Sequence, residues 1–219
     1  GILSSASLGG GVYFKTSGTV SIKGGSISGN TAGHGGGLYI SGDNSTLQLL
    51  SGSITGNSAI MSEGGSGGGA YLLGTSSVFI SGGEISNNTV KSSNSYGVGL
   101  RLDKYSTVEM RGGEIKNNNT NYVKSSGGGI AFYGGGALAL SGGKITNNMT
   151  TQHGGGVVFV EEGALYLTGG EISNNKILWN DNIGNGGGIA FLKGGTMTMA
   201  DGCTISGNKG AKQGGGLYM

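Results

Sequence analysis

The 219-residue sequence has no proline, a single cysteine and few charged side chains. The lone cysteine, Cys203, excludes a framework of internal disulfides. Charged residues make up 11% of the chain and the formal net charge is +2, so the clustered lysines and arginines of a nucleic-acid-binding surface are not expected. No apolar run approaches the ~18–20 residues that span a bilayer, and we therefore expect no membrane insertion.

Glycine, by contrast, is abundant, with 53 residues. It lacks the G-X-Y period of collagen, and the regular apolar spacing argues against a disordered chain. Two short motifs repeat along the sequence. A glycine triplet or its variant, followed by an apolar residue, begins at Gly9, Gly35, Gly67, Gly97, Gly127, Gly154, Gly186 and Gly214. An Ile-x-[Gly/Asn]-Asn motif ends at Asn30, Asn57, Asn88, Asn118, Asn148, Asn175 and Asn208.

We call each repeat, from one glycine triplet to the next, a rung. A period of about 30 residues indicates a solenoid or a propeller. Within residues 127–148 the apolar residues alternate at Ile130 and Phe132 and again at Leu138 and Leu140, as in strands with one buried face, and Ile145 follows. Propeller blades need four strands in ~40–50 residues. The sequence therefore predicts one all-β domain over residues 1–219, a right-handed parallel β-helix of about seven rungs with three short strands each.

The residue before each motif asparagine predicts a sharp corner. Only glycine and asparagine occur there, and these residue types tolerate the left-handed backbone region. The column is Gly29, Gly56, Asn87, Asn117, Asn147, Asn174 and Gly207. We expect the motif asparagines that follow to form a structural ladder, in which each amide bonds to neighbouring rungs inside the corner.

The segment between each ladder asparagine and the next glycine triplet varies in length. Insertions in repeat proteins usually map to one face, often the binding face. The longest consecutive segments, Ser58–Ser66, Thr89–Tyr96 and Asn119–Ser126, are expected to lie side by side as loops. The segment Lys176–Asn185 carries the only tryptophan, Trp179, which is a candidate ligand-binding residue.

The first strand of each early rung carries one aromatic residue on its outward face. Tyr13, Tyr39 and Tyr71 lie between the two apolar positions of that strand, and Arg101 takes the same place in the next rung. We expect an exposed aromatic row with a cation beside it, which is a candidate platform for a carbohydrate or a protein. The alternative is that the stacked aromatics only stabilise neighbouring strands.

The charged residues of the fourth rung, 97–126, argue against catalysis. They fall into pairs of opposite sign two residues apart, so each pair is expected to neutralise itself and no acid and base converge. The pairs are Arg101 with Asp103, Glu109 with Arg111, and Glu114 with Lys116. We therefore predict no catalytic residues and no enzyme, and a polysaccharide-active β-helix enzyme is a lesser alternative.

No metal or other cofactor is predicted. His34 and His153 share a column but lie four rungs apart, roughly 19 Å at ~4.8 Å per rung, too far to share an ion. Glu84 and Glu114 are neighbours in a column, but Lys144 follows them and no third oxygen donor for calcium is evident.

Ice binding is another lesser alternative. It would need a regular threonine array on a flat face, and the sequence provides such an array only in part. One predicted outward column is mostly hydroxyl, but its partner column is charged and irregular. The hydroxyl column is Ser28, Thr55, Ser86, Lys116, Thr146, Ser173 and Ser206.

The phase-locked pair of motifs, GGG[I/L/V] followed by IxxN, resembles the paired GGAI and FxxN repeats of the chlamydial polymorphic membrane proteins. More broadly it is similar to the glycine-rich β-helix repeats of bacterial autotransporter passengers and surface proteins. The resemblance covers nearly the whole chain, with Ile in place of Phe and Gly in place of Ala in most copies. It implies a secreted or surface-displayed stalk or adhesin and names no ligand.

The favoured hypothesis is thus a non-enzymatic extracellular β-helix that displays one edge for adhesion to a host-cell or matrix protein or a glycan. The main alternative is a structural subunit that stacks end to end with copies of itself in an extracellular filament. Neither end of the repeat array carries a polar cap, so we expect a segment of a longer chain or of a filament.

Overall fold

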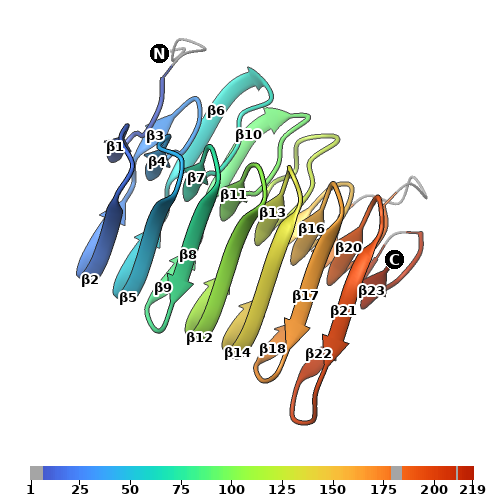
Figure 1. The fold of residues 1–219 in the computed structure, drawn as a ribbon. Coiled ribbons are helices and arrows are strands. Elements are labelled where there is room, and N and C mark those ends of the chain that lie inside the picture. The colour runs from blue at the N-terminus through green and yellow to red at the C-terminus, as the bar shows by residue number, and fades with distance from the viewer. Residues whose placement is uncertain (1–6, 179–183, 211) are drawn as a thin grey trace.

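The computed structural model describes residues 7–178, 184–210 and 212–219. In this part of the chain the strands are stacked as successive rungs of a parallel solenoid, which runs from the N-terminal to the C-terminal end (Figure 1). No helix among the described residues is long and apolar enough to cross a membrane. The predicted parallel β-solenoid is confirmed.

One sheet is built from the short strand that follows each glycine triplet. Its strands pair in register, so that Val12 lies beside Leu38 and Ile130 beside Val157. These are the apolar columns that the alternation predicts. The eight strands, in order, are β1 (Val12–Phe14), β4 (Leu38–Ile40), β7 (Ala70–Leu72), β11 (Leu100–Leu102), β13 (Ile130–Phe132), β16 (Val157–Phe159), β20 (Ile189–Phe191) and β23 (Leu217–Tyr218).

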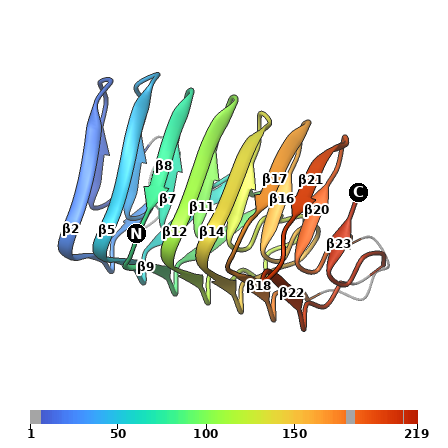
Figure 2. The ribbon, with the colours of Figure 1, turned by 60° about the horizontal axis from the view of Figure 1, so that its bottom comes forward.

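The second and third predicted strands of each rung form one large sheet (Figure 2). In four rungs they are a single long strand, with a register shift near a Ser-Gly or Gly-Gly pair, as between β12 and β14. The sheet runs β2 (Thr19–Ser28), β5 (Ser45–Thr55), β8 (Ser76–Ile80), β12 (Ser106–Lys116), β14 (Gly136–Thr146), β17 (Gly163–Leu167) and β21 (Gly195–Met199). The shorter β9 (Glu84–Ser86), β18 (Glu171–Ser173) and β22 (Thr204–Ser206) pair beside it.

The core lies between these sheets and repeats from rung to rung. Phe132, Phe159 and Phe191 stack nearly parallel, with ring centroids 4.7 and 4.6 Å apart. Stacking of like side chains brings many atoms into contact, which favours dispersion attraction. One isoleucine per rung from the third position, such as Ile115, completes this core.

A fourth side closes the rung where the sequence predicts loops. Short strands follow the ladder asparagine in five rungs, because one small or apolar residue per rung, such as Ala59, Val90 or Ile177, points inward. A single inward residue is too short a pattern to distinguish from a loop. The strands are β3 (Thr31–Ala32), β6 (Ser58–Glu63) and β10 (Thr89–Ser93) in one sheet, and β15 (Met149–Thr150) and β19 (Lys176–Ile177) in another.

Candidate functional site

The asparagine ladder is formed as predicted. Asn88 shows the pattern: its backbone N–H and its side-chain Nδ2 donate to Asn118 Oδ1 at 3.1 and 2.9 Å, and Nδ2 also donates to Ile54 O at 2.9 Å. The same donations to the next rung occur at Asn30, Asn57, Asn118, Asn148 and Asn175. The five interior ladder side chains are fully buried, which makes the ladder a structural element.

The corner before the ladder is confirmed as well. Every residue of the glycine and asparagine column has φ between 54° and 67°. In this region a Cβ is costly except for asparagine and aspartate, which explains why only two residue types occur there.

The aromatic row differs from its prediction. The rings do follow one another, with centroids 5.7 Å apart for Tyr13 and Tyr39 and 5.1 Å apart for Tyr39 and Tyr71. Only Tyr13 is well exposed, whereas Tyr39 and Tyr71 are 5% and 6% exposed. The expected exposure of Tyr39 and Tyr71 is wrong. His34 and Arg101 pack against the Tyr71 ring, and the Tyr39 ring lies between those of Tyr13 and Tyr71. A ligand-binding role for these residues stays a prediction.

Arg101 is the centre of a compact polar and aromatic cluster. Its guanidinium carbon lies 4.7 Å from the ring centre of Tyr71 and 4.4 Å from that of Tyr133. Nε pairs with Asp103 Oδ1 at 2.9 Å, and a terminal nitrogen donates to Ser66 Oγ at 2.8 Å. Tyr71 donates its hydroxyl proton to Asp103 Oδ2 at 2.7 Å. The mostly buried Arg101 therefore connects rungs two to five, and little of it faces solvent.

Burial is the main cause of the shifted pKa values in and around this cluster. It raises the pKa of Tyr71 and, to a smaller extent, of Tyr39 and Tyr96. Burial, with the nearby Arg101 charge as the second cause, lowers the pKa of His34. These groups are therefore neutral at pH 7, and the ion pair of Arg101 with Asp103 is the charged part of the cluster.

The two histidines belong to different rungs. The backbone of His34 forms an isolated β-bridge with Ser66, and that of His153 forms one with Ser126. The His153 side chain accepts a hydrogen bond at Nδ1 from the Asn185 backbone N–H at 3.2 Å. Burial lowers the pKa of His153. Within the described residues no three His, Cys, Asp or Glu side chains come together as metal ligands would.

The predicted ion pairs of the fourth rung are formed. Arg101 pairs with Asp103 and Arg111 with Glu109 at 2.9 and 2.6 Å, and Lys116 pairs with Glu114. Lys116 also reaches the carboxylate of the rung before.

The ammonium of Lys116 lies 3.0 Å from Glu84 Oε2 as well as beside Glu114. The hydrogen bond from Lys116 is the main cause of the lowered pKa of Glu84. The pKa of Lys116 is raised, first by its hydrogen bond to Glu114 and second by its hydrogen bond to Glu84. A lysine thus stands between the two neighbouring glutamates.

The hydroxyl column expected to point outward is covered in three of its seven rungs. Ser86, Thr146 and Ser173 are buried, and Ser86 Oγ lies 2.9 Å from Thr55 Oγ1 and donates to Glu84 Oε1 at 3.0 Å. These three side chains are therefore less exposed than an outward array requires, and the hydroxyls of Ser86 and Ser173 donate to glutamates of their own strands.

The fourth side is interrupted at the fourth rung. Between β10 and β15 the chain at 119–126 forms no strand, only isolated bridges at its two ends. Asn119 pairs with Thr89 and Met149, and Ser126 pairs with Tyr96 and His153. The Thr120 hydroxyl donates to Val90 O at 2.8 Å, in a position where the neighbouring rungs have strand hydrogen bonds. It also accepts from the Tyr122 backbone N–H at 3.2 Å.

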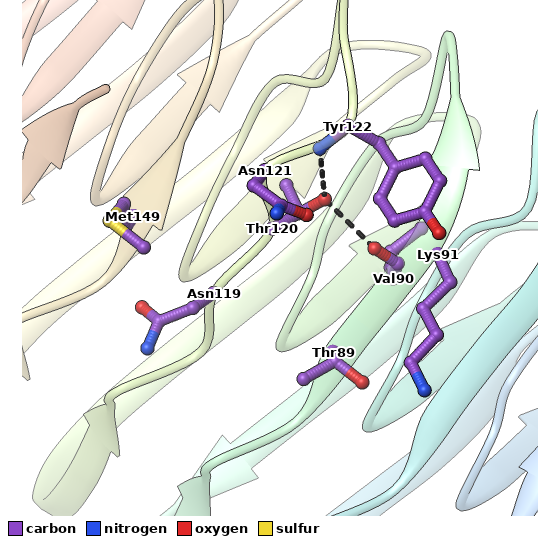
Figure 3. A pocket seen from close by; sticks show the side chains of 8 residues that line it. All are labelled: Thr89, Val90, Lys91, Asn119, Thr120, Asn121, Tyr122 and Met149. Atoms are coloured by element: carbon purple, nitrogen blue, oxygen red, sulfur yellow. Dashed lines mark hydrogen bonds between the residues drawn. The ribbon is translucent and has the colours of Figure 1, made fainter. Parts of the chain in front are cut away.

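A groove of about 380 Å³ lies at this interruption (Figure 3). In the view of Figure 3, Tyr122 and Lys91 lie on one side and Asn119 and Met149 on the other. The groove is not predicted from the sequence. Its lining residues are Thr89, Val90, Lys91, Asn119, Thr120, Asn121, Tyr122 and Met149.

Hydroxyl groups fasten the segment that forms one wall of the groove. Thr151 Oγ1 donates to Tyr122 O at 2.7 Å and accepts from the Ser125 N–H at 3.0 Å, and Thr150 Oγ1 donates to Ser125 O at 2.6 Å. Tyr122 and Val123 nevertheless remain 41% and 42% exposed. The segment is thus held at its base and presents an aromatic and an aliphatic side chain to solvent.

Trp179, the remaining candidate ligand-binding residue, lies outside the described residues.

The family described as right handed beta helix region matches residues 4–169, about three quarters of the chain. The chain belongs to the right-handed β-helix family. This agrees with the parallel solenoid and with the hand predicted for its crossovers. Neither the curated proteins nor the solved structures gave a match to this chain.

Proposed function

We propose that this β-helix is a non-enzymatic, extracellular display module that presents its fourth side to a host-cell or matrix protein or a glycan. The observation that carries the proposal is the contrast between repetition and variation. The ladder and core recur in rung after rung, whereas the fourth side changes from two-residue strands to the segment that exposes Tyr122 and Val123. The resemblance of the repeats to those of bacterial surface proteins supports the same role.

The charged groups support an absence of catalysis in this proposal. The carboxylates of Asp103, Glu109 and Glu114 each pair with a cation. A general acid and a general base must converge on one substrate, and these three pairs lie at separate places on the rung. Arg101 and Asp103, moreover, are enclosed by aromatic rings and have little surface to offer.

The experiment is a binding screen with the labelled 219-residue chain on intact cells, immobilised matrix proteins and a glycan array. We expect saturable binding to at least one of them. Reducing-sugar release from polyuronides and neutral glycans is measured in parallel, and we expect none above the buffer rate. Absence of binding to every surface, or turnover of any polysaccharide, would contradict the proposal.

The direction of the asparagine ladder favours a second candidate function, a filament of copies stacked end to end. Each ladder amide donates from Nδ2 to Oδ1 of the following rung. In a stack of copies, Asn208 Nδ2 of one copy would therefore donate to Asn30 Oδ1 of the next. Half-buried apolar side chains accompany both, such as Phe14 and Ile205. Negative-stain electron microscopy over a range of concentrations tests this candidate, and uniform single-chain rods throughout would overturn it.

A further inference from the structure

The groove at the fourth rung has a defined internal order. Thr89, Asn119 and Met149 bridge in turn across three rungs, so their side chains point to the same side in one row. The ring of Tyr122 and the side chain of Lys91 stand beside this row. The groove therefore combines an aromatic wall with hydroxyl and amide groups along its length, and its volume of about 380 Å³ is within the range of small-molecule sites.

One polar atom of this row has no partner. Among the described residues, nothing donates to the buried Oδ1 of Asn119. A buried acceptor without a hydrogen bond destabilises the fold. The terminal torsion of asparagine is broad, so rotation of the amide turns either its oxygen or its NH₂ group toward the groove. After this rotation the amide presents a donor or an acceptor to a ligand hydroxyl in the groove.

The backbone argues against an extended peptide as the occupant. Peptides that add a strand need free carbonyl and N–H groups along a sheet edge. On β10, however, Val90 O accepts from the Thr120 hydroxyl at 2.8 Å and Ser92 O accepts from the Ser125 hydroxyl at 3.4 Å. Recognition in this groove therefore depends on side chains.

The side-chain chemistry points to a sugar ring. A pyranose has a face of C–H groups, which packs on an aromatic ring, and a rim of hydroxyls, which pair with amides and hydroxyls. We propose that the groove binds a single hexopyranose unit, with its apolar face on Tyr122 and its hydroxyls toward Asn119, Asn121 and Thr89. This deepens the proposed display function, on which it rests, by naming the ligand class and its place.

Saturation-transfer NMR on the 219-residue chain tests the inference. The probes are the methyl pyranosides of glucose, galactose, mannose and N-acetylglucosamine. We expect saturation of the ring protons of at least one of them. We expect Tyr122→Ala to weaken its binding at least tenfold, Tyr122→Phe to retain binding because the ring face remains, and Asn119→Leu to weaken it.

Tyr105→Ala is the matched control, since Tyr105 is 79% exposed and does not line the groove. This variant should bind as the unaltered chain does, and circular dichroism checks that every variant keeps its sheet content. Absence of transfer from all four glycosides, or equal binding by Tyr122→Ala and the unaltered chain, would overturn the inference. If cells or matrix still bind the chain in that case, the display function stands and only the groove assignment falls; loss of all surface binding would remove the display function itself.

Discussion

The ladder corner and the fourth side follow each other directly in every rung, yet they behave differently. At the corner, Asn57, Asn88 and Asn118 make the same hydrogen bonds to the next rung, and all are fully buried. A few residues later, on the fourth side, β6 has six residues and β15 has two, and the segment 119–126 of the fourth rung forms no strand. The same stack thus contains a position that tolerates almost no change and a position that tolerates much.

The two regions differ in how the hydrogen bonds of the backbone are satisfied. In the corner the backbone leaves the sheet, and only the amide, with a donor and an acceptor, pairs with both neighbouring rungs. On the fourth side the strands bond to one another or, at Thr120 and Ser125, hydroxyls take over. Backbone groups and side-chain hydroxyls can both form the hydrogen bonds that the backbone needs there. The residues on this side are therefore less restricted, and some of them can serve ligand binding.

Removal of a central ladder asparagine should give the largest effect. Asn118→Ala leaves Ile85 O and the Asn88 N–H without partners in a buried corner. We expect the free energy of unfolding in urea to fall by about 3–5 kcal/mol. Asn30→Ala, at a half-exposed ladder position, is the matched control and should cost about 1 kcal/mol. Equal losses in the two variants would show that the ladder does not depend on burial.

The residue before the ladder should separate backbone strain from hydrogen bonding. Asn147 has φ of 55°, so Asn147→Ala is expected to cost about 1–2 kcal/mol, while Asn147→Gly should change stability by less than about 0.5 kcal/mol. Urea unfolding of both variants measures the difference. A glycine variant as unstable as the alanine variant would mean that the Asn147 side chain, and not its backbone conformation, is required.

The enclosed tyrosines should make the stack sensitive to alkali. Burial raises the pKa of Tyr71 above its unfolded value of about 10. The neutral tyrosine therefore stabilises the fold fully below pH 10, and this contribution is lost as the pH rises from 10 toward the folded pKa. We expect about 1.4 kcal/mol per pH unit above 10 for one such tyrosine. Urea unfolding at pH 8–11 should show a shallower decline for Tyr71→Phe, and parallel curves would contradict it.

A hydroxyl on the fourth side should matter less than a ladder amide. Thr120→Val keeps the shape of the side chain but removes the donor to Val90 O. We expect a loss of about 1 kcal/mol in urea unfolding, with the chain still folded. A loss as large as that of Asn118→Ala would mean that hydrogen bonds on the fourth side are as important for stability as those of the ladder corner.

The exposed wall of the groove should be the most tolerant position. Tyr122→Ala removes a side chain that is 41% exposed, and we expect its free energy of unfolding to stay within about 0.5 kcal/mol of the unaltered chain. Thermal unfolding followed by circular dichroism measures this. A stability loss above 1 kcal/mol would identify Tyr122 as part of the fold and not as part of a displayed surface.

Much of this architecture can be read from the chain because it is local and repeated. The alternation at Ile130 and Phe132 marks the first strand, and the restriction to glycine and asparagine at position 147 and its equivalents marks the corner. The opposite charges at Arg101 and Asp103 also predict their pairing. In each case the residue types along a single rung already carry the signal.

Other features depend on atoms from several rungs. Tyr39 and Tyr71 look exposed by strand alternation, but His34 and Arg101 from neighbouring rungs cover Tyr71. The groove exists because the chain at 119–126 leaves the fourth side between β10 and β15. In the inward column Thr120 follows Ala59 and Val90, but Thr150 takes the same place inside β15, so a threonine there does not mark the groove.

The amino-acid order thus specified the repeat, the corner, the ladder and the apolar columns, because period, φ preference and hydropathy act within one rung. Which outward side chains are enclosed and where a hollow opens were settled only on stacking, since burial and shape arise from neighbours about 30 residues away in the chain. The surface assigned here to ligand binding belongs to the second group.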